Sequence, residues 1–214
     1  MSDIKPIETV YNGYKFRSRL EARWAVFFDS LGIEYQYEPD GFVGLDDIKY
    51  LPDFYLTKAH VYVEVKGTDE ALKKDARKIT AAIDFDATPI STGIIIVGDI
   101  PNPDKISWGN IPMFNYLYCK KGIVSEYAAF TDSVFQPMKV ARGNDDILIH
   151  LFSYDEDFSD YFGEDGALPN NVSVNCIWSK ENMLSRKFEN LKAAYTKARQ
   201  ARFEHGETPI VRKP

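Results

Sequence analysis

One apolar stretch decides how the first half of the chain is expected to fold: Val61-Tyr62-Val63-Glu64-Val65-Lys66-Gly67. Its valines and tyrosine predict a β-strand over residues 60–66. Successive side chains of a strand point to opposite faces, so Glu64 and Lys66 share one face while the valines on either side of Glu64 take the other. Placing a carboxylate and an ammonium group in an apolar strand is costly unless the two charges serve each other or a ligand.

Two further acids precede this strand. Asp53 lies in Leu51-Pro52-Asp53-Phe54-Tyr55-Leu56, part of an extended run over about residues 49–56, where Pro52 indicates an edge strand or a strand start. Glu21 lies in Phe16-Arg17-Ser18-Arg19-Leu20-Glu21-Ala22-Arg23-Trp24. A helix is predicted from Ser18, a suitable N-cap, to about Leu31, because apolar residues recur on one face and a glycine follows.

The rest of the first half predicts the elements around these acids. Residues 34–38 alternate polar and aromatic side chains, which favours a half-buried strand. A helix is predicted from Glu70 to about Phe85, and the wholly apolar residues 93–98 predict a strand in a sheet covered on both faces. Strands that lead into a central strand, a helix and a buried strand indicate an α/β fold, with a mixed β-sheet core flanked by helices.

The chain is expected to divide into three parts. Residues 8–130 form the α/β core. Residues 131–206 form a C-terminal extension, in which an acidic segment precedes a long basic helix from Ser179 to about His205. Residues 207–214 form a loose tail. Further strands are expected over residues 113–118 and 172–178, and residues 147–152 form either a strand or another buried segment.

The three acids and the lysine suit one kind of chemistry. Hydrolysis of a phosphodiester bond needs a cation near the scissile phosphate and a water held in line for attack. Mg²⁺ prefers hard oxygen ligands and usually keeps several waters. Asp53 and Glu64 can supply two carboxylates from neighbouring strands, and the main-chain carbonyl of Val65 a third ligand. Lys66 can orient the attacking water or stabilise charge on the phosphate, and Glu21 can hold a second metal ion or a water bound to the first.

Each of these residues also has a purely structural interpretation. Glu21 follows Ser18 by three residues, so the pair can be a capping box. Asp53 can be a turn aspartate, and Glu64 with Lys66 can be a charge pattern on an exposed face. The four residues occur in order, on the expected elements and at a spacing that suits a metal site. This combination favours the catalytic interpretation.

The pattern Glu21, Pro52-Asp53 and Glu64-Val65-Lys66 resembles the PD-(D/E)xK nuclease superfamily, which includes restriction endonucleases, Holliday-junction resolvases and TnsA-type transposon nucleases. The longer stretches quoted around Glu21 and Asp53 are similar to small nucleases of this superfamily encoded by bacteriophages and prophages. The resemblance covers about residues 11–100. It implies a restriction-endonuclease-like fold with a four-stranded mixed core, and cleavage of DNA by an endonuclease or nickase with Mg²⁺ or Mn²⁺ as cofactor.

Composition places the chain among folded proteins. Its 214 residues are 44% hydrophobic and 14% aromatic, which argues against disorder over most of the length. The chain contains no run of about 18 apolar residues, so no transmembrane helix is expected. Its first residues also lack the apolar stretch of a signal peptide. Cys119 and Cys176 are isolated, so neither a zinc site nor a disulfide framework is indicated. We therefore expect a cytoplasmic protein, located in the bacterial host if it is phage encoded.

The net charge of −6 is unlike that of a typical nucleic-acid binder, but the charges are unevenly distributed. Basic side chains cluster around the predicted site, and we expect them to contact DNA: Lys15, Arg17, Arg19, Arg23, Lys73, Lys74, Arg77 and Lys78. The structural alternative is that these basic side chains form ion pairs with nearby acidic side chains, such as Arg17 with Glu21 at helical spacing.

A second hypothesis belongs to a different class of protein. Residues 132–165 hold nine acidic against two basic residues. A catalytically inactive protein of the same fold can use such a segment to bind or inhibit a protein partner. Metal binding separates the two hypotheses. The sequence also leaves open whether the chain forms a homodimer.

Overall fold

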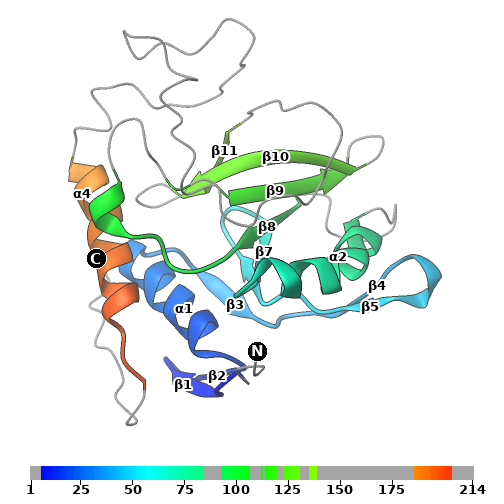
Figure 1. The fold of residues 1–214 in the computed structure, drawn as a ribbon, viewed down its shortest axis with the longest axis horizontal. Helices are drawn as coiled ribbons and strands as arrows, with labels where there is room; N and C mark the ends of the chain where they lie inside the picture. The colour runs from blue at the N-terminus through cyan, green and yellow to red at the C-terminus, as the bar shows by residue number, and fades with distance from the viewer. Residues whose placement is uncertain are drawn as a thin grey trace, which may run out of the picture.

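The structure is a computed structural model with a mixed α/β architecture (Figure 1). It describes residues 6–83, 93–106, 112, 114–119, 123–130, 135–138 and 186–203. Within these residues the chain forms one seven-stranded sheet, two separate two-stranded sheets and the helices α1, α2 and α4. In the part of the chain that is described, no helix is both long and apolar enough to span a membrane.

The large sheet has the strand order β11-β10-β9-β8-β7-β6-β3. Its strands are β3 (Tyr35–Tyr37), β6 (Phe54–Leu56), β7 (Val61–Val65), β8 (Ile94–Val97), β9 (Phe114–Cys119), β10 (Ile123–Phe130) and β11 (Phe135–Met138). Strands β7 and β8 are parallel, with Glu64 opposite Ile96, and the other neighbours in the sheet are antiparallel. The predicted mixed sheet is therefore confirmed, with more strands than the four expected.

Helices cover both faces of the sheet at β7 and β8, whose residues are all buried. The helix α1 (Arg19–Leu31) shares one apolar cluster with the odd-numbered valines of β7, including Val63. The helix α2 (Asp69–Ile83) shares a second cluster with Tyr62 on the opposite face of the strand. Because side chains alternate along a strand, Glu64 lies on the same side of the sheet as Tyr62 and α2.

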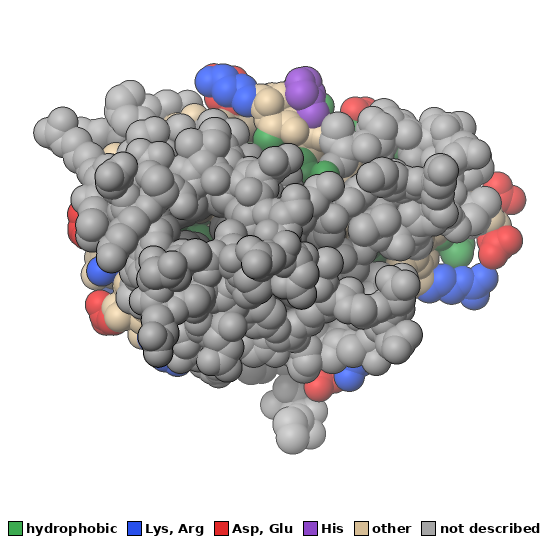
Figure 2. Space-filling view, turned by 90° about the horizontal axis from the view of Figure 1, so that it is seen from above, with side chains coloured by type: hydrophobic (Ala, Val, Ile, Leu, Met, Phe, Trp, Pro, Cys, Tyr) green, Lys and Arg blue, Asp and Glu red, His purple; other side chains and the backbone are tan. Residues whose placement is uncertain are grey.

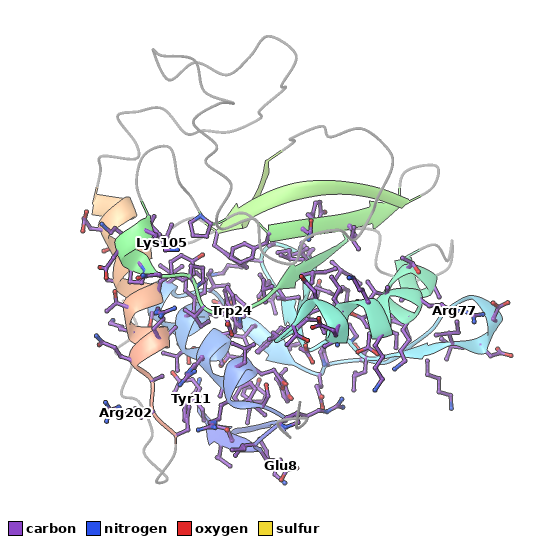
Figure 3. All side chains as sticks on the ribbon, in the orientation of Figure 1. Glu8, Tyr11, Trp24, Arg77, Lys105 and Arg202 are labelled. Carbon is purple, nitrogen blue, oxygen red and sulfur yellow. The ribbon has the colours of Figure 1, made fainter. Side chains whose placement is uncertain are left out.

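The predicted ends of α1 are confirmed. The Ser18 side chain accepts a hydrogen bond from the Glu21 N–H at the N-terminus, and Gly32 ends the helix with a φ of 67°, which favours glycine. The buried indole of Trp24 donates to the carbonyl oxygen of Gly98 at 2.8 Å, which fixes α1 against the loop that follows β8. Figure 3 shows Trp24 between α1 and the sheet.

The helix α4 (Arg186–Gln200) packs along α1, although the two are far apart in sequence (Figure 1). The Tyr195 ring is fully buried and stacks on the Phe27 ring, with their centroids 4.4 Å apart. The Arg199 side chain donates to the Ile100 carbonyl oxygen at 2.8 Å. The predicted helix is present, but it ends at Gln200 and not at His205, and residues 179–185 lie outside the described part.

The extended run predicted over residues 49–56 is two strands in two different sheets. Strand β5 (Lys49–Tyr50) pairs with β4 (Phe42–Val43) in a short hairpin, whereas β6 joins the large sheet between β3 and β7. Pro52 lies in the break, where its missing N–H costs no ladder hydrogen bond. It therefore marks a strand start, and the alternative of an edge strand is wrong for β6.

A β-hairpin that was not expected from the sequence precedes α1. Strands β1 (Thr9–Tyr11) and β2 (Tyr14–Phe16) pair across the turn Asn12–Gly13, where both φ angles are positive, 47° and 84°. The Tyr11 hydroxyl donates to Asp29 of α1 at 2.9 Å. The apolar segments singled out at 147–152 and 172–178, and all of the acidic segment except the strand β11, lie outside the described residues.

Candidate active site

Glu21 reaches the candidate site from the first turn of α1. Its Oε1 accepts from the Ser18 hydroxyl at 2.7 Å, and its Oε2 accepts from the Arg17 N–H at 3.1 Å and the Tyr37 hydroxyl at 2.6 Å. The capping interaction that the sequence offered as a structural alternative is therefore present. It does not remove Glu21 from the site, because the side chain is only 7% exposed and its charge acts on Asp53.

Asp53 lies just before β6 and is 8% exposed. Its Oδ2 accepts a hydrogen bond from the Val65 N–H at 2.7 Å, and its own carbonyl oxygen accepts from the Glu38 N–H. The carboxylate is thereby fixed beside the end of β7, next to Glu64. Asp53 is thus a buried acid that ties two strands together and not a surface turn residue.

Glu64 and Lys66 form a charged pair inside the protein. Glu64 is 3% exposed, so the alternative of an exposed charge pattern is wrong for this strand. The Lys66 Nζ lies 2.6 Å from Glu64 Oε1, as expected for two side chains on one face. The Tyr50 hydroxyl donates to the other oxygen, Oε2, at 2.6 Å.

Two residues of α2 extend this pair outwards. Lys66 Nζ also lies 2.8 Å from Asp75 Oδ2, and Lys78 Nζ lies 3.0 Å from Asp75 Oδ1. Charges therefore alternate from Glu64 through Lys66 and Asp75 to the exposed Lys78. An ammonium group held between two carboxylates has charged partners on two sides, which lowers the cost of burying it.

The electrostatics of the site show a surplus of negative charge. Burial first, and then the charges of Glu64 and Glu21, raise the pKa of Asp53 well above its ordinary value. Burial alone would lower the pKa of Lys66, but the carboxylates of Glu64 and Asp75 outweigh it and raise that pKa. Lys66 therefore neutralises Glu64, while Asp53 is left to hold a proton or to share a cation.

The oxygen atoms of the site can supply some, but not all, of the ligands of a hard divalent cation. The described residues contain no group of three or more His, Cys, Asp or Glu side chains placed to hold a metal ion. A cation here would take two carboxylates, those of Asp53 and Glu64, and complete its shell with the Val65 carbonyl and water. Mg²⁺ is commonly held by one or two carboxylates with several retained waters, so the chemistry of the residues suits it.

The residues predicted to contact DNA are mostly engaged with partners in the protein. Lys15 pairs with Glu8 at 2.6 Å, Arg17 with Glu38 at 2.6 Å and Arg77 with Asp46 at 3.2 Å. The Arg23 side chain donates to the Ala201 carbonyl oxygen at 3.4 Å. The predicted Arg17–Glu21 pair forms through the Arg17 main-chain N–H instead of its guanidinium group.

The basic residues of α2 form a second group within the predicted set. Lys73, Lys74, Arg77 and Lys78 are all exposed on its outer face. Figure 3 shows Arg77 near the β4–β5 hairpin, which carries its partner Asp46. Among the described side chains visible in Figure 2, basic and acidic groups lie beside one another at the rim and form no patch of one sign.

Three residues of the site were not singled out from the sequence: Tyr37, Tyr50 and Asp75. Asp75 carries a readable signal, because it falls between Leu72 and Ile79 on the inner face of an amphipathic helix, where an acid needs a partner. Nothing in the sequence distinguishes the two tyrosines, because aromatic residues in short strands usually serve packing alone.

No family model, no curated protein and no solved structure matches the chain.

Proposed function

We propose that the chain is a metal-dependent DNA endonuclease or nickase with a restriction-endonuclease-like core of the PD-(D/E)xK type. The observation that carries the proposal is the convergence of Glu21, Asp53, Glu64 and Lys66. They come from α1, the start of β6 and the end of β7. The three acids are buried, Lys66 pairs with Glu64, and the charges of Glu64 and Glu21 both act on Asp53. We further propose that the protein is encoded by a phage or prophage and acts in the bacterial cytoplasm.

Each residue has a role in this proposal. Asp53, Glu64 and the Val65 carbonyl hold Mg²⁺ or Mn²⁺, which supplies charge neutralisation at the scissile phosphate. Lys66 orients the attacking water or stabilises the charge that develops on the phosphate oxygens. Glu21, oriented by Tyr37, holds water beside Asp53 or shares in a second cation site.

The basic face of α2 is the proposed contact for the DNA backbone. Lys73, Lys74, Arg77 and Lys78 follow the Glu64–Lys66 strand on the next element, and Lys78 contacts Asp75 at the edge of the site. Contacts of this kind hold the backbone without reading its sequence.

The test is cleavage of linear, nicked, branched and single-stranded DNA, with RNA as a control, in Mg²⁺ or Mn²⁺ and after chelation. The parent protein should cut at least one DNA form and stop with chelator. Asp53→Asn should abolish cutting while the fold is retained, because asparagine keeps the volume and can still accept from the Val65 N–H. Asp104→Asn makes the same chemical change at an exposed site and should cut like the parent. Equal cutting by Asp53→Asn would refute the site assignment.

A further inference from the structure

The Lys66 ammonium group lies between two carboxylates that come from different elements. Its Nζ is 2.6 Å from Glu64 Oε1 on β7 and 2.8 Å from Asp75 Oδ2 on α2. The Lys66 and Asp75 side chains are 14% and 23% exposed, so water screens these contacts only in part. Lys66 therefore occupies one oxygen of a carboxylate that we have proposed as a cation ligand.

The packing of α2 sets the position of Asp75. Leu72 and Ile79 are buried against the sheet, at 1% and 0% exposed, and Asp75 falls three residues after the first and four before the second. Residues at these spacings share one face of a helix, so Asp75 faces the sheet and Lys66. Its second oxygen is bound by Lys78 at 3.0 Å, which orients the carboxylate with Oδ2 towards Lys66.

We propose that Asp75 is a positioning residue that retains Lys66 when a divalent cation binds Glu64. This inference rests on the proposed function. A cation beside Glu64 repels the ammonium group from Oε1, and a buried ammonium group without a partner is strongly disfavoured. Asp75 already contacts Lys66, so the ammonium group keeps a carboxylate partner and stays within the site.

The proposal predicts that Asp75 and Lys66 act on cation affinity as a unit. Removing the ammonium group removes a competitor for Glu64, so Lys66→Met should bind the cation more tightly. Asp75→Asn leaves Lys66 with Glu64 alone, so the cation should bind more weakly. A purely electrostatic attraction between Asp75 and the cation also weakens binding in Asp75→Asn, but it does so by the same factor whether or not Lys66 is present.

The experiment is a double-mutant cycle on Mn²⁺ affinity, measured by calorimetry on the full chain without DNA at up to millimolar Mn²⁺. We expect Lys66→Met to bind about tenfold more tightly. Asp75→Asn should lower affinity about fivefold in the parent but less than about twofold in the Lys66→Met background. Glu70→Gln removes one exposed charge from the same helix and should change affinity less than about twofold.

Two precautions keep the cycle decisive. Asp75→Ser serves as a second variant, and circular dichroism with thermal unfolding establishes that each protein is folded. An equal effect of the Asp75 substitution in both backgrounds overturns the role of Asp75 but leaves the proposed function standing. A parent that binds no Mn²⁺ overturns both, whereas the expected cycle without DNA cleavage overturns the nuclease and retains the positioning role.

Discussion

The hydroxyl group of Tyr50 donates a 2.6 Å hydrogen bond to Oε2 of Glu64. Tyr50 belongs to the small β4–β5 sheet, outside the large sheet that carries Glu64. On the other side of the site, Tyr37 makes a bond of the same length to Glu21. Outer residues of this kind fix the orientation of ligating carboxylates, and their loss weakens metal affinity or activity even though they touch no ligand.

Tyr50→Phe should therefore impair the site while preserving its shape. Loss of the hydroxyl leaves one oxygen of a buried carboxylate without its donor, which should lower the free energy of unfolding by about 1–3 kcal/mol. Cation affinity or cleavage rate should fall about 10- to 100-fold. Urea unfolding and Mn²⁺ calorimetry measure the two effects. Tyr55→Phe is the matched control, because its hydroxyl meets His60 at the surface, and equal effects of the two substitutions would contradict the prediction.

The pKa of Asp53 predicts how stability depends on pH. An acid whose pKa is higher in the folded state holds its proton more tightly there, so the fold loses stability as the pH rises above the unfolded value of about 4. In chelator, Asp53→Asn should be more stable than the parent by about 1–3 kcal/mol near neutral pH, and the difference should vanish towards about pH 4. Denaturant unfolding across this range measures it.

The control for this pH profile is Asp46→Asn, which changes an acid that is exposed beside Arg77. Its stability should follow that of the parent at every pH. A constant difference between Asp53→Asn and the parent would show that burial and neighbouring charge do not raise the pKa of Asp53.

The outer face of α2 should account for part of the salt dependence of DNA binding. Each phosphate contact on duplex DNA contributes about 0.9 to the slope of log affinity against log salt. Lys73 and Lys74 are exposed on α2, so replacing both with alanine should flatten the slope by about 1.8 and weaken binding to DNA of unrelated sequences equally. Fluorescence anisotropy on the uncut DNA in chelator measures the slope. Lys58→Ala removes an exposed basic side chain that pairs with Glu34, and it should leave the salt slope unchanged.

The docking of α4 predicts a single unfolding transition for the described elements. Tyr195 is fully buried against Phe27, so Tyr195→Ala should cost about 3–5 kcal/mol and shift the whole transition. Tryptophan fluorescence follows it, because Trp24 lies 6.4 Å from Tyr195 between ring centroids. Lys197→Ala on the exposed side of α4 should have an effect within about 0.5 kcal/mol. A separate early transition in Tyr195→Ala would instead make the C-terminal extension an independent unit.

The parts of the fold that local chemistry specifies could be predicted from the sequence. The helix α1 has a serine cap, an apolar stripe and a terminal glycine, and β7 has β-branched residues in strict alternation. Both were predicted within a residue or so of their observed ends. Glu64 and Lys66 share a face because alternation requires it, and their contact follows from that alone.

Contacts between distant elements could not be predicted in this way. Nothing local indicates that Asp75 meets Lys66 or that Tyr195 meets Phe27, because both contacts depend on how helices cross the sheet and one another. The break at Pro52 was missed for a related reason. One extended run and two short strands have the same local pattern, and only their pairing partners distinguish them.

The contact between Arg23 and Ala201 joins residues 178 positions apart, and it has a consequence for synthesis. A ribosome adds about 5–20 residues per second, so roughly 10–35 s pass between the emergence of the two halves of the α1–α4 interface. During that interval the side of α1 that carries Phe27 has no covering helix. The nascent chain therefore presents an apolar surface that chaperones can bind until α4 has been synthesised and docks.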